Sequence, residues 1–336
     1  MTRKRPTIID VARAAEVSKS TVSRVLQGAD ASVKEETREA VWKAIRKLGY
    51  ERNAVASSLR TDRTYMVMLV TPDIANPFWP EVARGLQDTL EEPGYSVVLG
   101  NGDWDERREV RLLKTTRRNR FDGIAINPTT NSRELQAIGI PAVILGVRDG
   151  FPNFDMVGAD SYSGTLEALS YLYRLGHRRI GFIRGHRTPV SGQARDRAYQ
   201  EFIEQRRLPL DESLVVEAPY DLKGGRKAMQ SLLGLRRRPT AVLAANDILA
   251  IGAMQAAATA SLNIPADLSI MGMDDIYPAS LTTPPLTTMA KPKYDIGCQA
   301  ARFLLERIEG SASRAGRRCV LPCQLVERGS TAPPPA

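Results

Sequence analysis

The sequence predicts an α/β protein in which a small helical head precedes a body of two doubly wound lobes with parallel sheets. The chain has 336 residues, which is more than one ordinary domain needs. Its net charge of +9 is unevenly distributed, since residues 1–63 hold 14 Lys and Arg against 8 Asp and Glu, or +6 of the total. From Tyr65 onward, short apolar strands alternate with amphipathic helices in two successive series, which is typical of parallel sheets with helical crossovers.

The composition is that of a globular cytoplasmic protein. Hydrophobic residues make up 43% and charged residues 25%, and no apolar run approaches the ~20 residues that span a bilayer. The basic amino terminus leads into Thr7 without an apolar signal core, so we do not expect secretion or membrane insertion. The chain has three cysteines, which is a small and odd number. This argues against a disulfide framework and favours a reducing compartment.

The first fifty residues have the pattern of three short helices. Thr7 and Asp10 have the spacing of a capping box that opens the first helix, and a turn separates it from a second helix over Ser18–Leu26 that Ser18 can cap. Another capping box at Ser32–Glu35 is expected to open a third helix that runs to Gly49. The pattern favours a helix-turn-helix unit, although an ordinary three-helix packing unit would have the same spacing.

The second helix has two distinct faces. Its apolar positions point inward: Val22, Val25 and Leu26. Its polar positions lie on the other face: Lys19, Ser20, Ser23 and Arg24. A basic module on a nearly balanced body indicates a polyanionic partner, while charge alone equally allows a merely solvated head.

Two runs in the head identify a family. Thr7-Ile8-Ile9-Asp10-Val11-Ala12 and Val17-Ser18-Lys19-Ser20-Thr21-Val22-Ser23-Arg24-Val25-Leu26 closely resemble the DNA-binding head of the lactose-repressor (LacI) family of bacterial transcription regulators. The resemblance implies DNA contacts from Thr7, Ser18, Lys19, Ser20, Thr21, Ser23 and Arg24. One position departs from the family: Glu16 stands where a turn glycine is usual, and would be strained if that position needs positive φ.

The segment after the head is similar to the family's hinge. Tyr50-x-x-Asn53-x-x-Ala56-x-x-Leu59 matches a short helix that enters the DNA minor groove from each subunit of a dimer. The resemblance makes Leu59 the apolar wedge and Ala56 the point where two hinge helices approach, with Asn53 beside them. The segment is too short to be helical alone, so we expect order only on DNA; a plain linker is the alternative.

The body alternates strands and helices in two series. We expect strands at 66–71, 96–100, 123–127, 142–146, 179–184, 241–245 and 269–273, and helices at 80–90, 107–119, 163–175, 195–205 and 247–260. Separate strings in family order carry the resemblance through the body: Asn76-Pro77-Phe78-Trp79, Gly176-His177-Arg178-Arg179-Ile180, Asn246-Asp247, Gly272-Met273-Asp274-Asp275 and Pro284-Pro285-Leu286-Thr287-Thr288. They imply two lobes of periplasmic-binding-protein type.

These observations set the domain boundaries. Residues 1–52 form the head, 53–63 the hinge helix and linker, and 64–330 the two-lobed effector-binding and dimerisation domain, while 331–336 form a disordered tail. The tail lacks leucine heptads, so a homodimer is expected in place of a tetramer.

Ligand candidates follow from strand ends and from the resemblance. Ligands of doubly wound sheets bind at the carboxyl ends of strands, which nominates Asp73, Asn127, Asn246 and Asp274. The resemblance adds Arg195 as a ligand-binding arginine and Phe78, Trp79 and Tyr220 as rings that cover a ligand. Charged and amide groups pair with the hydroxyls of a polyol, and rings cover its C–H face. Asn246 and Asp274 could instead cap loops, and Tyr220 could be a loop residue.

Two further positions depart from the family. Gly146 stands where members often have an Asp at a strand end, and Lys291 stands where a Gln is common. A lost carboxylate and a gained ammonium would favour a ligand that carries an acid or phosphate, unless Lys291 faces solvent.

Catalytic chemistry has little support in the sequence. No nucleophile-elbow or phosphate-loop motif occurs, the cysteines lack metal-ligand spacing, and His177 at a helix end suits a cation beside terminal carbonyls. We therefore expect no enzyme, cofactor or metal, but a ligand-responsive transcription regulator, taken to be a repressor. It would bind a pseudo-palindromic operator as a homodimer under control of a sugar, sugar acid or sugar phosphate. The alternatives are a transport-associated sugar-binding protein and a regulator controlled by a corepressor or protein partner.

Overall fold

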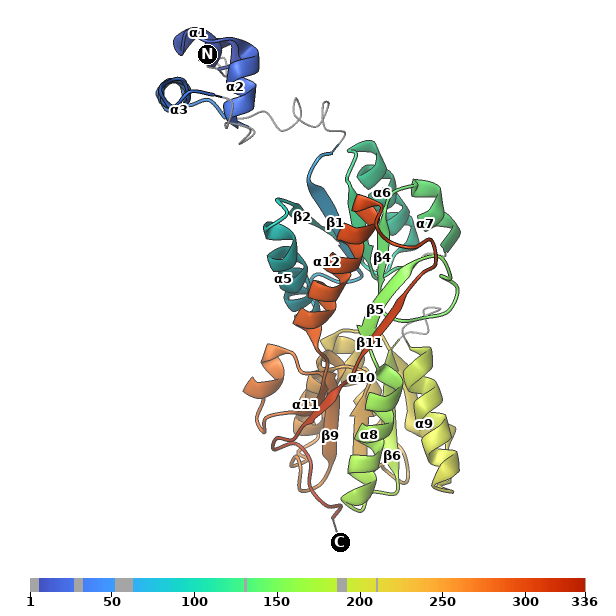
Figure 1. Cartoon of the computed structure of the whole chain (residues 1–336). Helices are drawn as coiled ribbons and strands as arrows, with labels where there is room; N and C mark the ends of the chain where they lie inside the picture. Colours follow the sequence, from blue (N-terminus) through green and yellow to red (C-terminus); the bar gives the residue numbers. More distant parts are fainter. Residues whose placement is uncertain are drawn as a thin grey trace. The chain divides into compact units, whose positions relative to one another are not determined.

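A computed structural model describes residues 6–26, 33–51, 63–129, 132–185, 192–209 and 211–335 (Figure 1). The chain divides into two compact units, Met1–Thr64 and Tyr65–Ala336. The predicted hinge residues Asn53, Ala56 and Leu59 lie outside the described residues. No helix of the described part is long and apolar enough to cross a membrane.

The head contains the three predicted helices, α1 (Ile8–Ala14), α2 (Lys19–Leu26) and α3 (Glu35–Leu48). The predicted caps of the first two helices are confirmed. Thr7 and Asp10 form a reciprocal capping box, and the Ser18 hydroxyl accepts a hydrogen bond from the Thr21 amide at 3.1 Å. The three helices enclose one small apolar core: Val11, Ala12, Val22, Val25, Val41 and Ala44.

Two local features of the head bear on the sequence expectations. Glu16 lies in the turn between α1 and α2 with φ +54°, so this position does adopt the conformation that a glycine accepts without strain. The third helix begins later than predicted, because Lys34 is its N-cap and makes no capping hydrogen bond through its side chain. The capping box expected at Ser32–Glu35 depends on Ser32, which lies outside the described residues.

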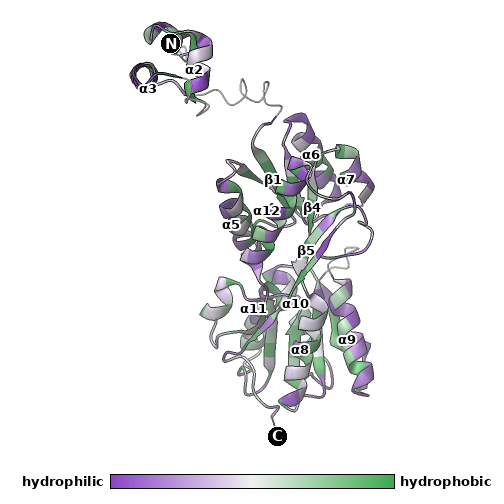
Figure 2. Cartoon of the chain, in the orientation of Figure 1, coloured by the Kyte–Doolittle hydropathy of each residue, from purple (hydrophilic) through white to green (hydrophobic). Residues whose placement is uncertain are grey.

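The first lobe is a parallel six-stranded sheet with the order β11-β5-β4-β3-β1-β2. Its strands are β1 (Met66–Thr71), β2 (Ser96–Asn101), β3 (Gly123–Ile126), β4 (Ala142–Leu145), β5 (Asp155–Ala159) and β11 (Arg318–Leu321). Its helices are α5 (Phe78–Glu91), α6 (Glu106–Arg118), α7 (Ser132–Ile138) and α12 (Lys293–Glu309). Figure 2 shows hydrophobic residues concentrated on the strands and hydrophilic residues on the outer faces of the helices.

Alternate residues of β1 pack against different helices, as a strand period of two requires. Val67 and Leu69 belong to the core under α5 and α12, whereas Met68 and Val70 belong to the core under α6 and α7. Helices α5 and α12 cross closely, because a Cβ on Gly85 would meet the backbone carbonyl of Tyr294. Both faces of the sheet are thus covered, and the polar ends of the strands remain for a site.

The second lobe repeats this plan with the sheet order β12-β10-β9-β8-β6-β7, in which only β12 runs antiparallel to its neighbour. Its strands are β6 (Ile180–Gly185), β7 (Val215–Ala218), β8 (Ala241–Ala244), β9 (Ser269–Asp274), β10 (Thr287–Ala290) and β12 (Gln324–Val326). Its helices are α8 (Ser161–Arg174), α9 (Gln193–Gln205), α10 (Leu222–Leu233) and α11 (Asp247–Thr259).

The chain passes between the lobes three times, from β5 to α8, from β10 to α12 and from β11 to β12. The last two crossings were not predicted, because the elements after residue 273 were not assigned from the sequence. The elements α7, β5, β7 and α10 were also missed. The predicted two-lobed parallel architecture is confirmed, with the carboxyl-terminal segment contributing α12 and β11 to the first lobe.

The end of the chain corrects two expectations. Residues 331 and 332 do not form a solvated tail, because Thr331 is hydrogen-bonded to Tyr171 and the Ala332 carbonyl lies 2.9 Å from His177 Nε2. His177 is fully buried and also contacts the Thr240 hydroxyl through Nδ1 at 2.9 Å. Burial lowers the pKa of this imidazole, so His177 is a neutral core residue and not a cation at a helix end.

Candidate functional site

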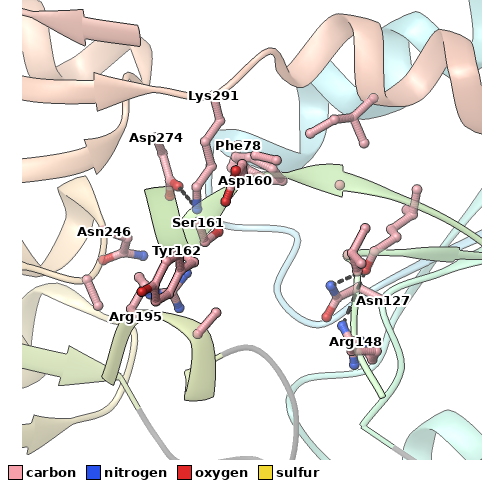
Figure 3. A pocket seen from close by; sticks show the side chains of 18 of the residues that line it. Phe78, Asn127, Arg148, Asp160, Ser161, Tyr162, Arg195, Asn246, Asp274 and Lys291 are labelled. Atoms are coloured by element: carbon pink, nitrogen blue, oxygen red, sulfur yellow. Dashed lines mark hydrogen bonds and ion pairs between the residues drawn. The ribbon is translucent and has the colours of Figure 1, made fainter. Parts of the chain in front are cut away.

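A cavity of about 450 Å³ lies where the carboxyl ends of both sheets meet (Figure 3). Strands of the first lobe deliver Asn127 after β3, Gly146 after β4 and Asp160 after β5. Strands of the second lobe deliver Asn246 after β8 and Asp274 at the end of β9. The volume falls in the range of about 300–1,000 Å³ that small-molecule sites occupy. The prediction that polar strand ends gather at one site is thus met by the geometry.

Arg195 and Tyr220 form part of the second-lobe wall. Arg195 lies in the first turn of α9, and its buried Nη2 donates to the Tyr220 hydroxyl over 2.6 Å. The Nε of Arg195 is buried and has no hydrogen-bond partner among the described residues. A guanidinium with spare donors at a cavity wall can bind the hydroxyl or oxyanion of a ligand.

Asp274 ends β9 in an unusual backbone conformation, with φ +119°. The Lys293 ammonium group holds this turn, since it donates to the carbonyl oxygens of Asp274 at 2.9 Å and Asp275 at 2.7 Å. Strained backbone that is fixed by several contacts is common at binding sites. The arrangement aims the Asp274 carboxylate at the cavity.

Lys291 faces the cavity and not the solvent. Its side chain is 10% exposed, and its Nζ lies 2.8 Å from Oδ1 of Asp274. The ammonium group also stands 5.7 Å from the ring centroid of Phe78. The positive charge that the sequence suggested for an acidic ligand is therefore matched by a carboxylate of the protein.

Asn246 has both of the roles that the sequence left open. Its Oδ1 accepts the Leu249 amide over 2.9 Å and caps α11, while the residue also lines the cavity. The cap fixes the amide plane, so that the Nδ2 group points towards the other wall (Figure 3).

The first-lobe wall is built around the end of β4. Asn127 donates from Nδ2 to the Leu145 carbonyl over 2.5 Å. Arg148 donates from Nη1 to the Pro128 carbonyl at 2.7 Å and from Nη2 to the Leu145 carbonyl at 3.3 Å. Gly146 has φ +105°, and a Cβ there would lie 3.1 Å from Nη2 of Arg148. A guanidinium thus occupies the region where the family often has a carboxylate.

Eight of the nine predicted ligand residues line this cavity: Phe78, Trp79, Asn127, Arg195, Tyr220, Asn246, Asp274 and Lys291. Asp73 does not, because its carboxylate accepts the Ala75 amide at 2.9 Å within the loop after β1. Proximity to a strand end was an insufficient criterion for Asp73, since a short Asp side chain readily caps its own turn.

Several lining residues were not predicted: Trp104, Arg148, Asp160, Tyr162 and Arg197. Asp160 follows β5, a strand that sequence reasoning did not assign, so the strand-end criterion was never applied to it. Arg148 stands two residues after a predicted strand end, and its charge was a usable signal. Trp104 follows β2 by three residues, and no sequence pattern singled it out.

The predicted DNA-contacting side chains of the head gather around α2. Val22 and Val25 are buried, while Ser18, Lys19, Ser20 and Arg24 are exposed and Thr21 and Ser23 are half-buried. Thr7 is exposed but its hydroxyl is occupied in the capping box, 2.7 Å from Asp10 Oδ2. The helix therefore offers a polar and basic face that is free of core packing.

Comparison with known families identifies both parts of the chain. The family described as bacterial regulatory proteins, lacI family, matches residues 7–53, and a periplasmic binding protein-like domain matches residues 169–331. The HTH-type transcriptional regulator DegA of Bacillus subtilis (strain 168) is 33% identical over 334 residues, covering 97% of this chain and 98% of DegA.

Two solved structures show the same architecture. A complex of the transcriptional regulator CelR with cellobiose is 32% identical, covers 97% of this chain and 100% of that chain, and has a TM-score of 0.74. The Lac repressor dimer bound to operator and the anti-inducer ONPF is 28% identical, covers 98% and 100% of the two chains, and has a TM-score of 0.88.

Proposed function

The chain belongs to the lacI family of bacterial regulatory proteins and is a transcription regulator, and we propose that it represses transcription as a homodimer on a pseudo-palindromic operator. A small hydroxylated effector controls its affinity for DNA. Because its target is chromosomal DNA, we place the protein in the cytoplasm.

The observation that carries this proposal is the cavity, which both lobes line in a chain that also bears a helix-turn-helix head. A ligand that contacts both lobes at once favours the arrangement of the lobes in which both contacts form. Two of the segments that join the lobes lie beside the cavity, at Asp160 and at Lys291. A ligand-induced change in the arrangement of the lobes therefore alters the conformation of these segments. CelR was solved with cellobiose, which supports a sugar-like effector for this chain as well.

On the DNA side, we propose that Lys19 and Ser20 at the start of α2 contact base edges and that Arg24 contacts a guanine or a phosphate. Thr7, Ser18, Thr21 and Ser23 would contact the DNA backbone nearby. Asn53, Ala56 and Leu59 would act in the minor groove.

Exposed apolar side chains support the dimer. The edge strand β2 exposes Val98 and Leu99, with the exposed Ile74 of the loop after β1 near Leu99, and the second lobe exposes Tyr277 and Leu281. Large apolar side chains at a sheet edge are a liability unless a partner covers them. A second copy is the partner that the Lac repressor dimer suggests. Leu99→Glu should therefore yield monomers in sedimentation velocity, and an unchanged dimer would exclude this face.

The experiment that tests the function is selection of binding sites from random duplex DNA with the full-length protein, followed by titration of the selected site. A palindromic consensus is expected. Arg24→Ala should weaken binding and lower the salt slope by about one, because one cation contact is lost. Lys43→Ala, an exposed cation on α3, is the matched control. Failure to select any sequence, or equal effects of the two variants, would refute the proposal.

A further inference from the structure

Arg148 is a buried cation without an ionic partner. Only 7% of the residue is exposed, and its hydrogen bonds go to two neutral carbonyl oxygens, those of Pro128 and Leu145. Among the described residues, no carboxylate forms an ion pair with it, and its buried Nε has no partner. Glu109 acts on it only at longer range, while the carboxylate of Glu109 accepts hydrogen bonds from Thr129 at 2.7 Å.

A buried charge without a counter-ion destabilises the folded state, so its presence in a cavity wall favours a role in ligand binding. Burial lowers the pKa of the Arg148 guanidinium to about 10, against the opposing charge of Glu109, so the group stays protonated at neutral pH. Perturbed, desolvated groups in a cleft are characteristic of functional sites. The positive charge is therefore available to a ligand.

Two of the other cations of the cavity are paired with carboxylates, Lys291 with Asp274 and the exposed Arg197 with Glu201 at 3.7 Å. On the second-lobe wall, Arg195 donates to the neutral Tyr220 hydroxyl and keeps a buried Nε without a partner among the described residues. Among the residues that the structure describes, the lining holds four cations (Arg148, Arg195, Arg197 and Lys291) against two carboxylates (Asp160 and Asp274), an excess of positive charge. Arg148 stands on the first-lobe wall, across the cavity from Arg195 and Asn246 (Figure 3).

Gly146 keeps the guanidinium accessible. A Cβ at 146 would lie 3.1 Å from Nη2 of Arg148 and 3.3 Å from Nδ2 of Asn127, so any larger side chain would crowd both donors. With glycine there, Arg148 and Asn127 present N–H groups side by side. A planar guanidinium beside an amide suits the two oxygens of a carboxylate or phosphate.

We propose that the effector is a hydroxylated oxyanion whose carboxylate or phosphate binds Arg148 in the first lobe. Its hydroxyls bind Arg195, Asn246 and Asp274 in the second lobe. This inference rests on the proposed function and narrows the class of effector. It transfers to Arg148 the anion preference that the sequence suggested for Lys291. A ligand of this kind joins the two lobes through opposite ends, and its anionic end removes the unmatched charge.

Calorimetry with the full-length protein tests the proposal on matched sets: D-glucose, D-gluconate and glucose 6-phosphate, and the galactose equivalents. Inorganic phosphate is the minimal probe, measured by thermal shift against chloride at equal ionic strength. We expect phosphate to raise the melting temperature, and the anion of at least one set to bind at least tenfold more tightly than its neutral sugar. The stronger anionic arm identifies the group as carboxylate or phosphate.

Three variants assign the effect to its residue. Arg148→Met should abolish both the phosphate shift and the anion preference, and melting without ligand should stay equal or rise because an unmatched charge is removed. Arg148→Lys keeps the charge without the planar fork, and should retain the preference with weaker binding. Arg117→Met is the matched control, since Arg117 is an exposed arginine of the same lobe that also donates to a carbonyl oxygen, that of Ala137.

The proposal is overturned if a neutral sugar binds as tightly as its acids, if phosphate gives no shift, or if the preference survives Arg148→Met. Operator titration separates this result from failure of the proposed function. A neutral sugar that changes operator affinity would leave the regulator intact and refute the oxyanion. Absence of specific DNA binding would refute the regulator, whatever the cavity binds.

Discussion

The indole ring of Trp104 stacks on the phenol ring of Tyr220, with ring centroids 5.3 Å apart and planes inclined by 18°. Trp104 belongs to the loop after β2 in the first lobe, and Tyr220 to the loop after β7 in the second. Both Asp103 and Trp104 have positive φ, 56° and 53°, so the loop adopts a strained turn to present the ring. The stack joins the lobes directly beside Arg195, which donates to the Tyr220 hydroxyl.

Trp104→Ala should weaken effector binding. Aromatic pairs contribute about 0.5–1.5 kcal/mol beyond burial, which corresponds to a loss of affinity of roughly 2–10-fold if the stack is made only with the lobes together. Trp104→Phe, which keeps a ring, should lose less. Calorimetry with the effector from the panel measures both variants, and equal affinity of Trp104→Ala and wild type would show that the stack does not stabilise the bound state.

Asp155 should make the first lobe sensitive to acid. This fully buried carboxylate at the start of β5 receives bidentate hydrogen bonds from Arg307 of α12 and from Arg317 before β11. Burial opposes its ionisation, but the two arginines outweigh burial and lower the pKa of Asp155 to about 2. The pKa of an Asp carboxyl in the unfolded chain is near 4. A carboxylate whose pKa is lower in the folded protein stabilises the fold at pH values above 4, and this stability is lost as the pH falls towards 2.

Asp155→Asn should therefore cost about 3 kcal/mol at pH 7, because two arginines lose their buried counter-charge. The difference in the free energy of unfolding between Asp155→Asn and wild type should shrink when urea unfolding is repeated below pH 4. A constant difference across that range would mean that the loss reflects packing and not charge.

His177 should add a pH dependence at milder acidity. The Ala332 carbonyl can only accept, so Nε2 carries a proton, and in the neutral ring Nδ1 accepts from the Thr240 hydroxyl. Burial lowers the pKa of His177 below its ordinary value of 6.5. The unfolded chain then binds a proton more readily, so stability is complete above pH 6.5 and falls as the pH drops through the folded pKa.

Melting temperatures between pH 7.5 and pH 5 would measure this effect. His177→Asn cannot titrate, so its melting temperature should fall less over this range than that of wild type. Deletion of residues 331–336 removes the Ala332 carbonyl and should lower the melting temperature at pH 7. If the deleted protein melts like wild type, the carboxyl-terminal residues do not contribute to the fold.

The sequence predicted the architecture well where apolar periodicity was strong. Strand β1, with alternating residues in two cores, and the capped helix α11 were assigned close to their bounds. The pattern failed for β12, a three-residue edge strand with no apolar run, and for β5, which starts with the buried carboxylate of Asp155. From sequence alone, a charged residue such as Asp155 is taken for a surface residue. Its arginine partners, 152 and 162 residues away, are known only from the fold.

The same limit applies to the cavity. Strand ends predicted Asn127, Asn246 and Asp274, because topology places all carboxyl ends together. Charge pairing could not be predicted, because Asp274 ends β9 and Lys291 directly follows β10, and the adjacency of these two strands appears only in the fold. The sequence therefore assigned an anion preference to a lysine that is already paired and overlooked the unpaired Arg148.

The Lys291–Asp274 pair should consequently behave as one unit. Both side chains are nearly buried, and removal of one partner leaves the other charge without its counter-ion. Lys291→Met should lower the free energy of unfolding by about 3 kcal/mol, and so should Asp274→Asn, whereas the double variant should recover most of the loss because no unpaired charge remains. Urea unfolding of the four proteins in a double-mutant cycle gives the coupling energy between the two side chains directly.

Lys293→Met is the control variant. Lys293 binds the carbonyl oxygens of Asp274 and Asp275, so Asp274→Asn should not rescue the stability that Lys293→Met loses. Additive losses of stability for Lys291→Met and Asp274→Asn would show that the two charges are not coupled. Lys291 would then be a candidate for binding an anionic ligand.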